Sequence, residues 1–123
     1  MPHRRLGHFD ILTKNNEVGK FIDTSSKEYL DLGLEAIHGL KGKIDIFEVN
    51  TGAISRGYKS TPYPQIEFLR EFNRLDFGAV VTSDCHDKNC IDTAFDEAEQ
   101  LLSSAGFKSK FILTENGFKE VVL

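Results

Sequence analysis

Three short apolar runs alternate with amphipathic stretches along most of this chain, and this alternation restricts the fold more than any other feature of the sequence. The runs cover residues 6–12, 44–49 and 78–83, and the stretches between them carry apolar residues at helical intervals. Strands that alternate with helices pair in parallel, because each helix returns the chain to the same end of the sheet. The sequence therefore predicts an α/β fold with a parallel sheet.

The first two predicted helices have clear start signals. Ser25 or Ser26 can cap the first helix, and Glu28 has capping-box spacing from Ser25. Pro62 and Pro64 are tolerated in a first turn and open the second helix. The predicted apolar faces consist of Tyr29, Leu30, Leu34, Ile37 and Leu40 in the first helix and of Ile66, Phe68, Leu69 and Phe72 in the second.

A third helix and a hairpin are predicted in the last third of the chain. Asn89 is expected to cap the helix, and Gly106 is expected to stop it. Residues 110–114 and 118–123 then form two apolar runs around the dipeptide Asn116-Gly117, which is a strong hairpin signal. The predicted apolar face of this helix is Ile91, Ala94, Phe95, Ala98, Leu101 and Leu102.

Composition limits the kind of protein. The 123 residues predict a single domain with a net charge of −4, in which both signs are interspersed. The sequence contains no basic stripe, so neither nucleic acid nor a membrane is expected as a partner. No apolar stretch approaches the roughly 20 residues that span a bilayer, and we expect a cytoplasmic protein. Cys85 and Cys90 are expected to be reduced.

Asp84 and His86 lie where the third apolar run gives way to a loop. Side chains two residues apart on extended backbone point the same way, so a carboxylate oxygen and an imidazole nitrogen can converge on one point. Both groups are ordinary ligands of zinc, manganese and iron. The alternative is an aspartate that caps the next helix beside a histidine on the surface.

Polar side chains also follow the first two runs. His8 and Asp10 are expected within the first strand, Glu48 and Asn50 at the end of the second, and Arg56 in the polar loop that follows. Taken singly, His8 could be a core histidine, Glu48 could pair with a lysine, and Arg56 could be solvated. The carboxyl ends of parallel strands share one edge, so a joint metal site is the favoured interpretation.

Three blocks in order resemble the last three blocks of the histidinol-phosphate phosphatases of the polymerase-and-histidinol-phosphatase (PHP) superfamily. The blocks are Gly7-His8-Phe9-Asp10, Glu48-Val49-Asn50-Thr51 with Arg56, and Ser83-Asp84-Cys85-His86-Asp87. The resemblance implies a distorted seven-stranded (β/α) barrel with a cluster of two or three divalent metals. It implies that His8, Asp84 and His86 are metal ligands and that Arg56 contacts the substrate phosphate.

The resemblance covers only the C-terminal half of such a barrel. The family's opening His-x-His metal pair has no counterpart here, and His38 falls on the polar side of its predicted helix. Residues 1–123 are therefore expected to form a single domain that corresponds to the C-terminal portion of a PHP-type barrel. Its open side would expose Ile44, Ile46 and Val80, so a homodimer, a swapped assembly or an N-terminal segment from another chain is expected to cover it.

The implied function is a metal-dependent phosphomonoesterase that converts L-histidinol phosphate to L-histidinol and phosphate in histidine biosynthesis. Lys14 would add positive charge near the small-molecule phosphate ester, and Asp10 and Asp87 are candidates for orienting ligands or for handling the proton of the leaving group. We expect the isolated chain to be inactive unless assembly completes its site. Two alternatives stay open: an inactive barrel fragment that binds metal or phosphate weakly, and a PHP phosphoesterase with another substrate.

Overall fold

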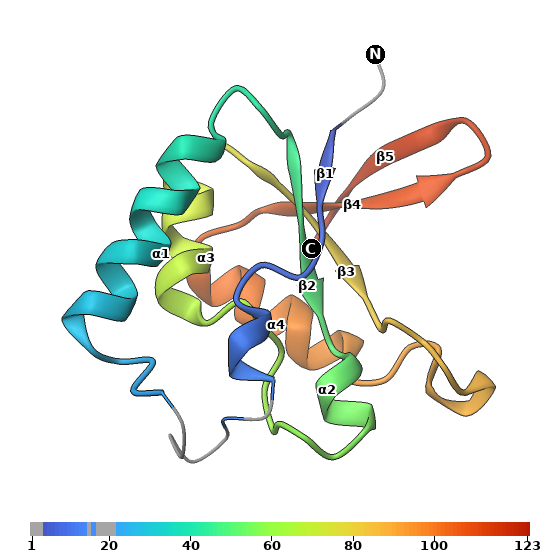
Figure 1. The fold of residues 1–123 in the computed structure, drawn as a ribbon. Helices are drawn as coiled ribbons and strands as arrows, with labels where there is room; N and C mark the ends of the chain where they lie inside the picture. Colours follow the sequence, from blue (N-terminus) through green and yellow to red (C-terminus); the bar gives the residue numbers. More distant parts are fainter. Residues whose placement is uncertain (1–3, 15, 17–21) are drawn as a thin grey trace.

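A five-stranded sheet forms the centre of the computed structural model, which describes residues 4–14, 16 and 22–123 (Figure 1). Strand order follows the sequence, and all pairs are parallel except the last, β4 with β5. This confirms the predicted α/β fold with parallel strands and a C-terminal hairpin. The elements are β1 (Arg5–Leu6), η1 (Ile11–Thr13), α1 (Lys27–Leu40), β2 (Ile46–Asn50), α2 (Gly52–Ser55), α3 (Ile66–Arg74), β3 (Gly78–Thr82), η2 (Lys88–Cys90), α4 (Phe95–Ala105), β4 (Ser109–Thr114) and β5 (Gly117–Val122).

The helices form one layer against the sheet. α3 packs between α1 and α4, and Figure 1 shows the three helices lying together, away from the β4–β5 hairpin. Phe72 of α3 is fully buried, stacked on Phe47 of β2 at 4.0 Å between ring centroids. Phe9 and Phe77 meet the Phe72 ring edge-on at 5.2 and 5.1 Å. This aromatic cluster joins the helical layer to the sheet.

Among the described helices, none has the length and apolar character needed to cross a bilayer.

The hairpin covers part of the opposite face of the sheet. The Arg5 guanidinium lies 5.4 Å from the centroid of the Phe118 ring, so the two edge strands β1 and β5 approach each other. Ile46 is only 1% exposed, and a Cβ at Gly78 would lie 2.6 Å from the Phe111 ring of β4. The single chain therefore buries Ile46, which we expected to need cover from another chain; Ile44 and Val80 are half-buried. Self-association stays a prediction.

The first strand is shorter than predicted. β1 ends at Leu6, whereas we expected a strand over residues 6–12. His8 and Asp10 have φ angles of 61° and 68°, in the left-handed region that breaks a strand. Their side chains thus do not share a side by strand alternation, and Leu12 is 67% exposed. The apolar residues between positions 6 and 12 thus predicted a longer strand than the structure contains.

The third helix also starts later than predicted. Asp87, not Asn89, provides the side-chain cap, and it caps the short η2 turn. Ala94 has φ 58°, which separates that turn from α4, and Ile91 is 61% exposed instead of lying on the apolar face. The polar loop after β2 likewise contains the short helix α2. The proline pair precedes α3 rather than lying in its first turn, since Gln65 is the N-cap residue.

Several end signals are confirmed. Ser26, one of the two candidates, caps α1 by accepting a hydrogen bond from the Tyr29 backbone N–H at 3.2 Å. Gly106 ends α4 with φ 106°, a conformation that favours glycine. Gly117 has φ 101° at the end of the hairpin turn.

Candidate functional site

The Glu48 carboxylate accepts hydrogen bonds from residues near the carboxyl ends of the first three strands. Its Oε1 accepts hydrogen bonds from the His8 backbone N–H and from Asn50 Nδ2, both at 3.0 Å. Its Oε2 accepts from the Thr82 hydroxyl at 2.6 Å. The side chain is 15% exposed, so these bonds compensate the carboxylate for its lost water. Glu48 thereby links the loop after β1 to β2 and β3 at one edge of the sheet.

Arg56, Asp84 and His86 form the second part of this edge. Arg56 Nη1 donates to the Asp84 carbonyl oxygen at 3.0 Å, and Nη2 donates to Asp84 Oδ2 at 3.4 Å. The Arg56 and Asp84 side chains are 26% and 33% exposed, so solvent weakens their attraction. Three of the predicted site residues are therefore in direct contact, with the guanidinium at the centre.

His86 has one ring nitrogen engaged. Nδ1 lies 2.8 Å from the Asp84 carbonyl oxygen and 3.0 Å from Arg56 Nη1. When Nδ1 carries the proton, it donates to the carbonyl, and Nε2 keeps its lone pair. A histidine held in this way can present Nε2 to a metal or accept a proton from a ligand.

The backbone at Asp84 differs from the extended form that we assumed. Asp84 has φ 47°, so the side chains of Asp84 and His86 are not aligned by strand alternation. Asp84 Oδ2 faces Arg56, and the His86 ring faces the Asp84 backbone. Asp84 and His86 are therefore linked through the Arg56 guanidinium and the Asp84 carbonyl oxygen. Their side chains do not converge on one shared position, although the metal-site prediction assumed that they would.

Tyr63 is a site residue that the sequence interpretation missed. Its hydroxyl lies 3.2 Å from His8 Nδ1, although the two residues are 55 positions apart. Burial, followed by the negative charges of Glu48 and Asp84, raises the pKa of Tyr63 to about 12. The phenol therefore stays neutral at physiological pH and orients the His8 ring. The sequence Pro62-Tyr63-Pro64 carries no pattern that would signal this contact.

Close packing at Gly52 holds the arginine in place. A Cβ at this position would lie 2.6 Å from Arg56 Nη2 and 2.8 Å from the Ser83 carbonyl oxygen. Asn50, which is fully buried, accepts a hydrogen bond from the Gly52 N–H at 2.8 Å. The absence of a side chain at Gly52 thus leaves the space that the guanidinium occupies.

Two further predicted residues have local roles. Lys14 Nζ lies 5.3 Å from the centroid of the Tyr58 ring, in a cation–π contact with the loop that carries Arg56. Asp87 accepts a hydrogen bond from the Asn89 N–H at 2.9 Å, as a cap of its own turn. This contact of Asp87 is thus local to its own turn, and the role of Lys14 near a phosphate stays a prediction.

Asp10 connects the first loop to α3. Its Oδ2 accepts from the Gln65 N–H at 3.0 Å, and its Oδ1 accepts from the Tyr29 hydroxyl. Burial raises the pKa of Asp10 above its ordinary value, and these two hydrogen bonds oppose that rise. The neutral carboxyl is thus favoured more in the folded chain than in the unfolded chain.

This raised pKa predicts a pH-dependent stability. The folded chain binds the Asp10 proton more tightly, so the stabilisation is present at low pH and is lost as pH rises through the folded pKa. Urea unfolding of the natural chain and of Asp10→Asn should be compared between about pH 3 and pH 7. We expect the natural chain to lose stability relative to the variant as pH rises. A difference that does not change with pH would contradict this.

The predicted metal ligands do not form a metal site as they stand. Within residues 4–14, 16 and 22–123, no group of three or more His, Cys, Asp or Glu side chains is placed to hold a metal ion. The Asp84 carboxylate faces the Arg56 cation, and His8 Nδ1 faces the Tyr63 hydroxyl. Metal chemistry at this edge would need ligands in addition to those that the described residues bring together.

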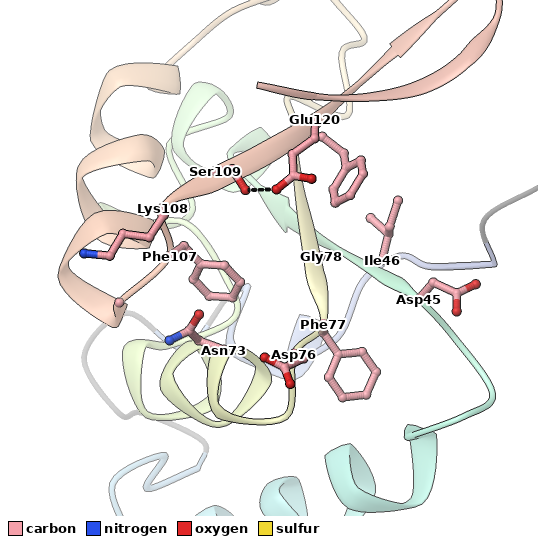
Figure 2. Close-up of a pocket in the computed structure, with 12 residues that line it drawn as sticks. Asp45, Ile46, Asn73, Asp76, Phe77, Gly78, Phe107, Lys108, Ser109 and Glu120 are labelled. Carbon is pink, nitrogen blue, oxygen red and sulfur yellow. Dashed lines mark hydrogen bonds between the residues drawn. The ribbon is translucent and has the colours of Figure 1, made fainter. Parts of the chain in front are cut away.

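Two cavities beside the sheet differ in whether they reach the carboxyl edge. A cavity of about 490 Å³ lies at the amino ends of β2, β3 and β4, away from this edge. Figure 2 shows its Lys108 and Asp45 directed to opposite sides, and the Ser109 hydroxyl donates a hydrogen bond to Glu120. A smaller cavity of about 280 Å³ reaches Glu48 itself. It is lined by Arg5, Leu6, Glu48, Thr82, Leu113 and Phe118, among others.

Comparison with known proteins gives no family assignment: no protein-family model and no curated protein matches this sequence. The chemistry of the site is therefore inferred from its own residues and from the resemblance of the three sequence blocks.

Proposed function

We propose that this chain is the C-terminal portion of a PHP-type (β/α) barrel and supplies the phosphate-binding part of a metal-dependent phosphomonoesterase of the histidinol-phosphatase kind. One observation carries the proposal: Arg56 lies at the carboxyl edge of the parallel strands, in contact with Asp84 and His86 from the neighbouring strand end. A guanidinium at this edge is suited to bind the oxygens of a phosphate ester.

The strand order supports the barrel part of the proposal. In a (β/α) barrel each new strand joins the same side of the sheet and each helix stays outside, so strand order follows sequence order. β1 to β4 follow this rule, with α1, α3 and α4 in one layer. A doubly wound sheet would instead reverse its order at one point. The approach of β1 and β5 is also consistent with a sheet that curls.

Zinc, manganese or iron is the proposed cofactor. His8, Asp84 and His86 are the proposed share of its ligands, and the remaining ligands would come from an assembly or another segment. These three residues alone do not make a complete ligand set among the residues that the structure describes. The proposed substrate is L-histidinol phosphate, which rests on the resemblance.

Ligand binding tests the proposal. The chain is expected to bind histidinol phosphate, and Arg56→Gln should weaken binding at least about tenfold, because the phosphate loses its charged contact. Arg70→Gln, on the exposed side of α3, is the matched control and should change little. Histidinol without the phosphate should bind much more weakly. Equal affinities of the natural chain and Arg56→Gln would refute the proposal.

The second candidate is a catalytically inactive barrel fragment that binds phosphate weakly. The pairing of Asp84 with Arg56 favours this candidate, because the guanidinium charge beside the carboxylate opposes a metal cation at the same group. Metal content and histidinol phosphate turnover should be measured on the natural chain, Asp84→Ala and His86→Ala. Turnover that follows metal content supports the enzyme, whereas phosphate binding without turnover supports the fragment. A phosphoesterase with another substrate would be identified by turnover of a different phosphate ester.

A further inference from the structure

We propose that Asp84 masks the phosphate site of this chain by acting as an internal competitor for Arg56. The inference rests on the proposed function, since it takes Arg56 as the phosphate-binding residue. Both terminal nitrogens of Arg56 are already engaged by acceptors of Asp84: Nη1 by the carbonyl oxygen at 3.0 Å and Nη2 by Oδ2 at 3.4 Å. A phosphate that binds end-on, through one N–H of each terminal nitrogen, needs the same pair of nitrogens.

The competition follows from charge and geometry. A guanidinium binds a phosphate best through two parallel N–H groups directed at two oxygens. Here one N–H of the end-on pair meets a carboxylate, so a phosphate that binds end-on must displace Oδ2 and then lie beside a second negative charge. The contact between Nη2 and Oδ2 is long, at 3.4 Å, and both side chains are partly exposed. The attraction between them is therefore weak enough for a phosphate to displace the carboxylate.

Arg56 does not depend on the Asp84 carboxylate for its position. The Asp84 carbonyl oxygen accepts from Nη1, and this contact does not involve the Asp84 side chain. The guanidinium also packs against Gly52, where a Cβ would lie 2.6 Å from Nη2. Neutralising Asp84 should therefore unmask a guanidinium that is already in place. If the carboxylate instead positioned Arg56, the same change would weaken phosphate binding.

Phosphate titration distinguishes these two roles. Inorganic phosphate should be titrated by calorimetry into the natural chain and Asp84→Asn, in a buffer with a metal chelator. We expect Asp84→Asn to bind phosphate about fivefold more tightly, the range of a partly exposed ion pair. Asp92→Asn makes the same charge change at an exposed position of the loop before α4 and should alter affinity less than about twofold.

Each result has a separate meaning. Arg56→Gln should lose phosphate binding both alone and combined with Asp84→Asn. Unchanged or weaker binding by Asp84→Asn, with binding still lost in Arg56→Gln, overturns the masking and leaves the proposed phosphate site intact. An equal gain in Asp92→Asn also overturns it, because general charge would then explain the effect. Failure of both the natural chain and Asp84→Asn to bind phosphate overturns the masking and the proposed site together. Thermal melting should confirm that each variant is folded.

Discussion

Replacement of Phe72 by alanine is expected to lower the free energy of unfolding by about 3–5 kcal/mol. Phe72 is fully buried and stacks on Phe47 at 4.0 Å. The rings of Phe9 and Phe77 meet it edge-on, so truncation removes contacts with the sheet, the first loop and the start of β3 at once. Neighbouring rings are too rigid to fill the cavity completely. Urea unfolding monitored by circular dichroism measures the loss.

The matched comparison is Ile91→Ala. Ile91 is 61% exposed, although its sequence spacing suggested a place on the apolar face of a helix. We expect this change to cost less than about 0.5 kcal/mol, as is usual at exposed positions. A loss at Ile91 as large as that at Phe72 would show that residues 88–94 continue the helix as the sequence pattern predicted.

The second large effect is expected at two glycines of α1 that should respond in opposite directions. A Cβ at Gly33 would lie 2.2 Å from Cζ of Phe68, a buried ring of α3, so Gly33→Ala forces either the ring or the two helices to shift. We expect a loss of about 1–3 kcal/mol in the free energy of unfolding. Nothing lies within 4 Å of a Cβ at Gly39, so Gly39→Ala should gain about 0.5 kcal/mol from helix propensity.

Thermal and urea unfolding of both glycine variants test this packing. Helix propensity alone predicts that both alanines stabilise α1. A gain in stability for Gly33→Ala would therefore mean that Phe68 does not pack on Gly33. Opposite signs at the two positions would support the close contact between α1 and α3.

Local sequence patterns predicted the parts of this fold that depend on neighbouring residues. The apolar face of α1, the Ser26 cap and the Gly106 stop follow from helical spacing and from backbone preferences within a few residues. The alternation of strands and helices also predicted the parallel sheet and the edge at which Glu48 and Arg56 lie. These features need no knowledge of the rest of the chain.

The strand ends were less predictable. His8 and Asp84 take left-handed backbone conformations, although both follow apolar segments that predict extended backbone. Tertiary hydrogen bonds hold these positions: the His8 N–H donates to Glu48, and the Asp84 carbonyl oxygen accepts from Arg56. Local propensity does not include such bonds, so it predicted strands that were too long.

The sequence by itself determined which residue types follow each strand, because strand positions along the chain and side-chain chemistry are both local information. Only the tertiary structure decided how those residues are paired. The contacts of Tyr63 with His8, of Thr82 with Glu48 and of Arg56 with Asp84 join residues 28 to 55 positions apart. Such pairs depend on strand register and on the path of the loops, which the packing of the whole chain sets.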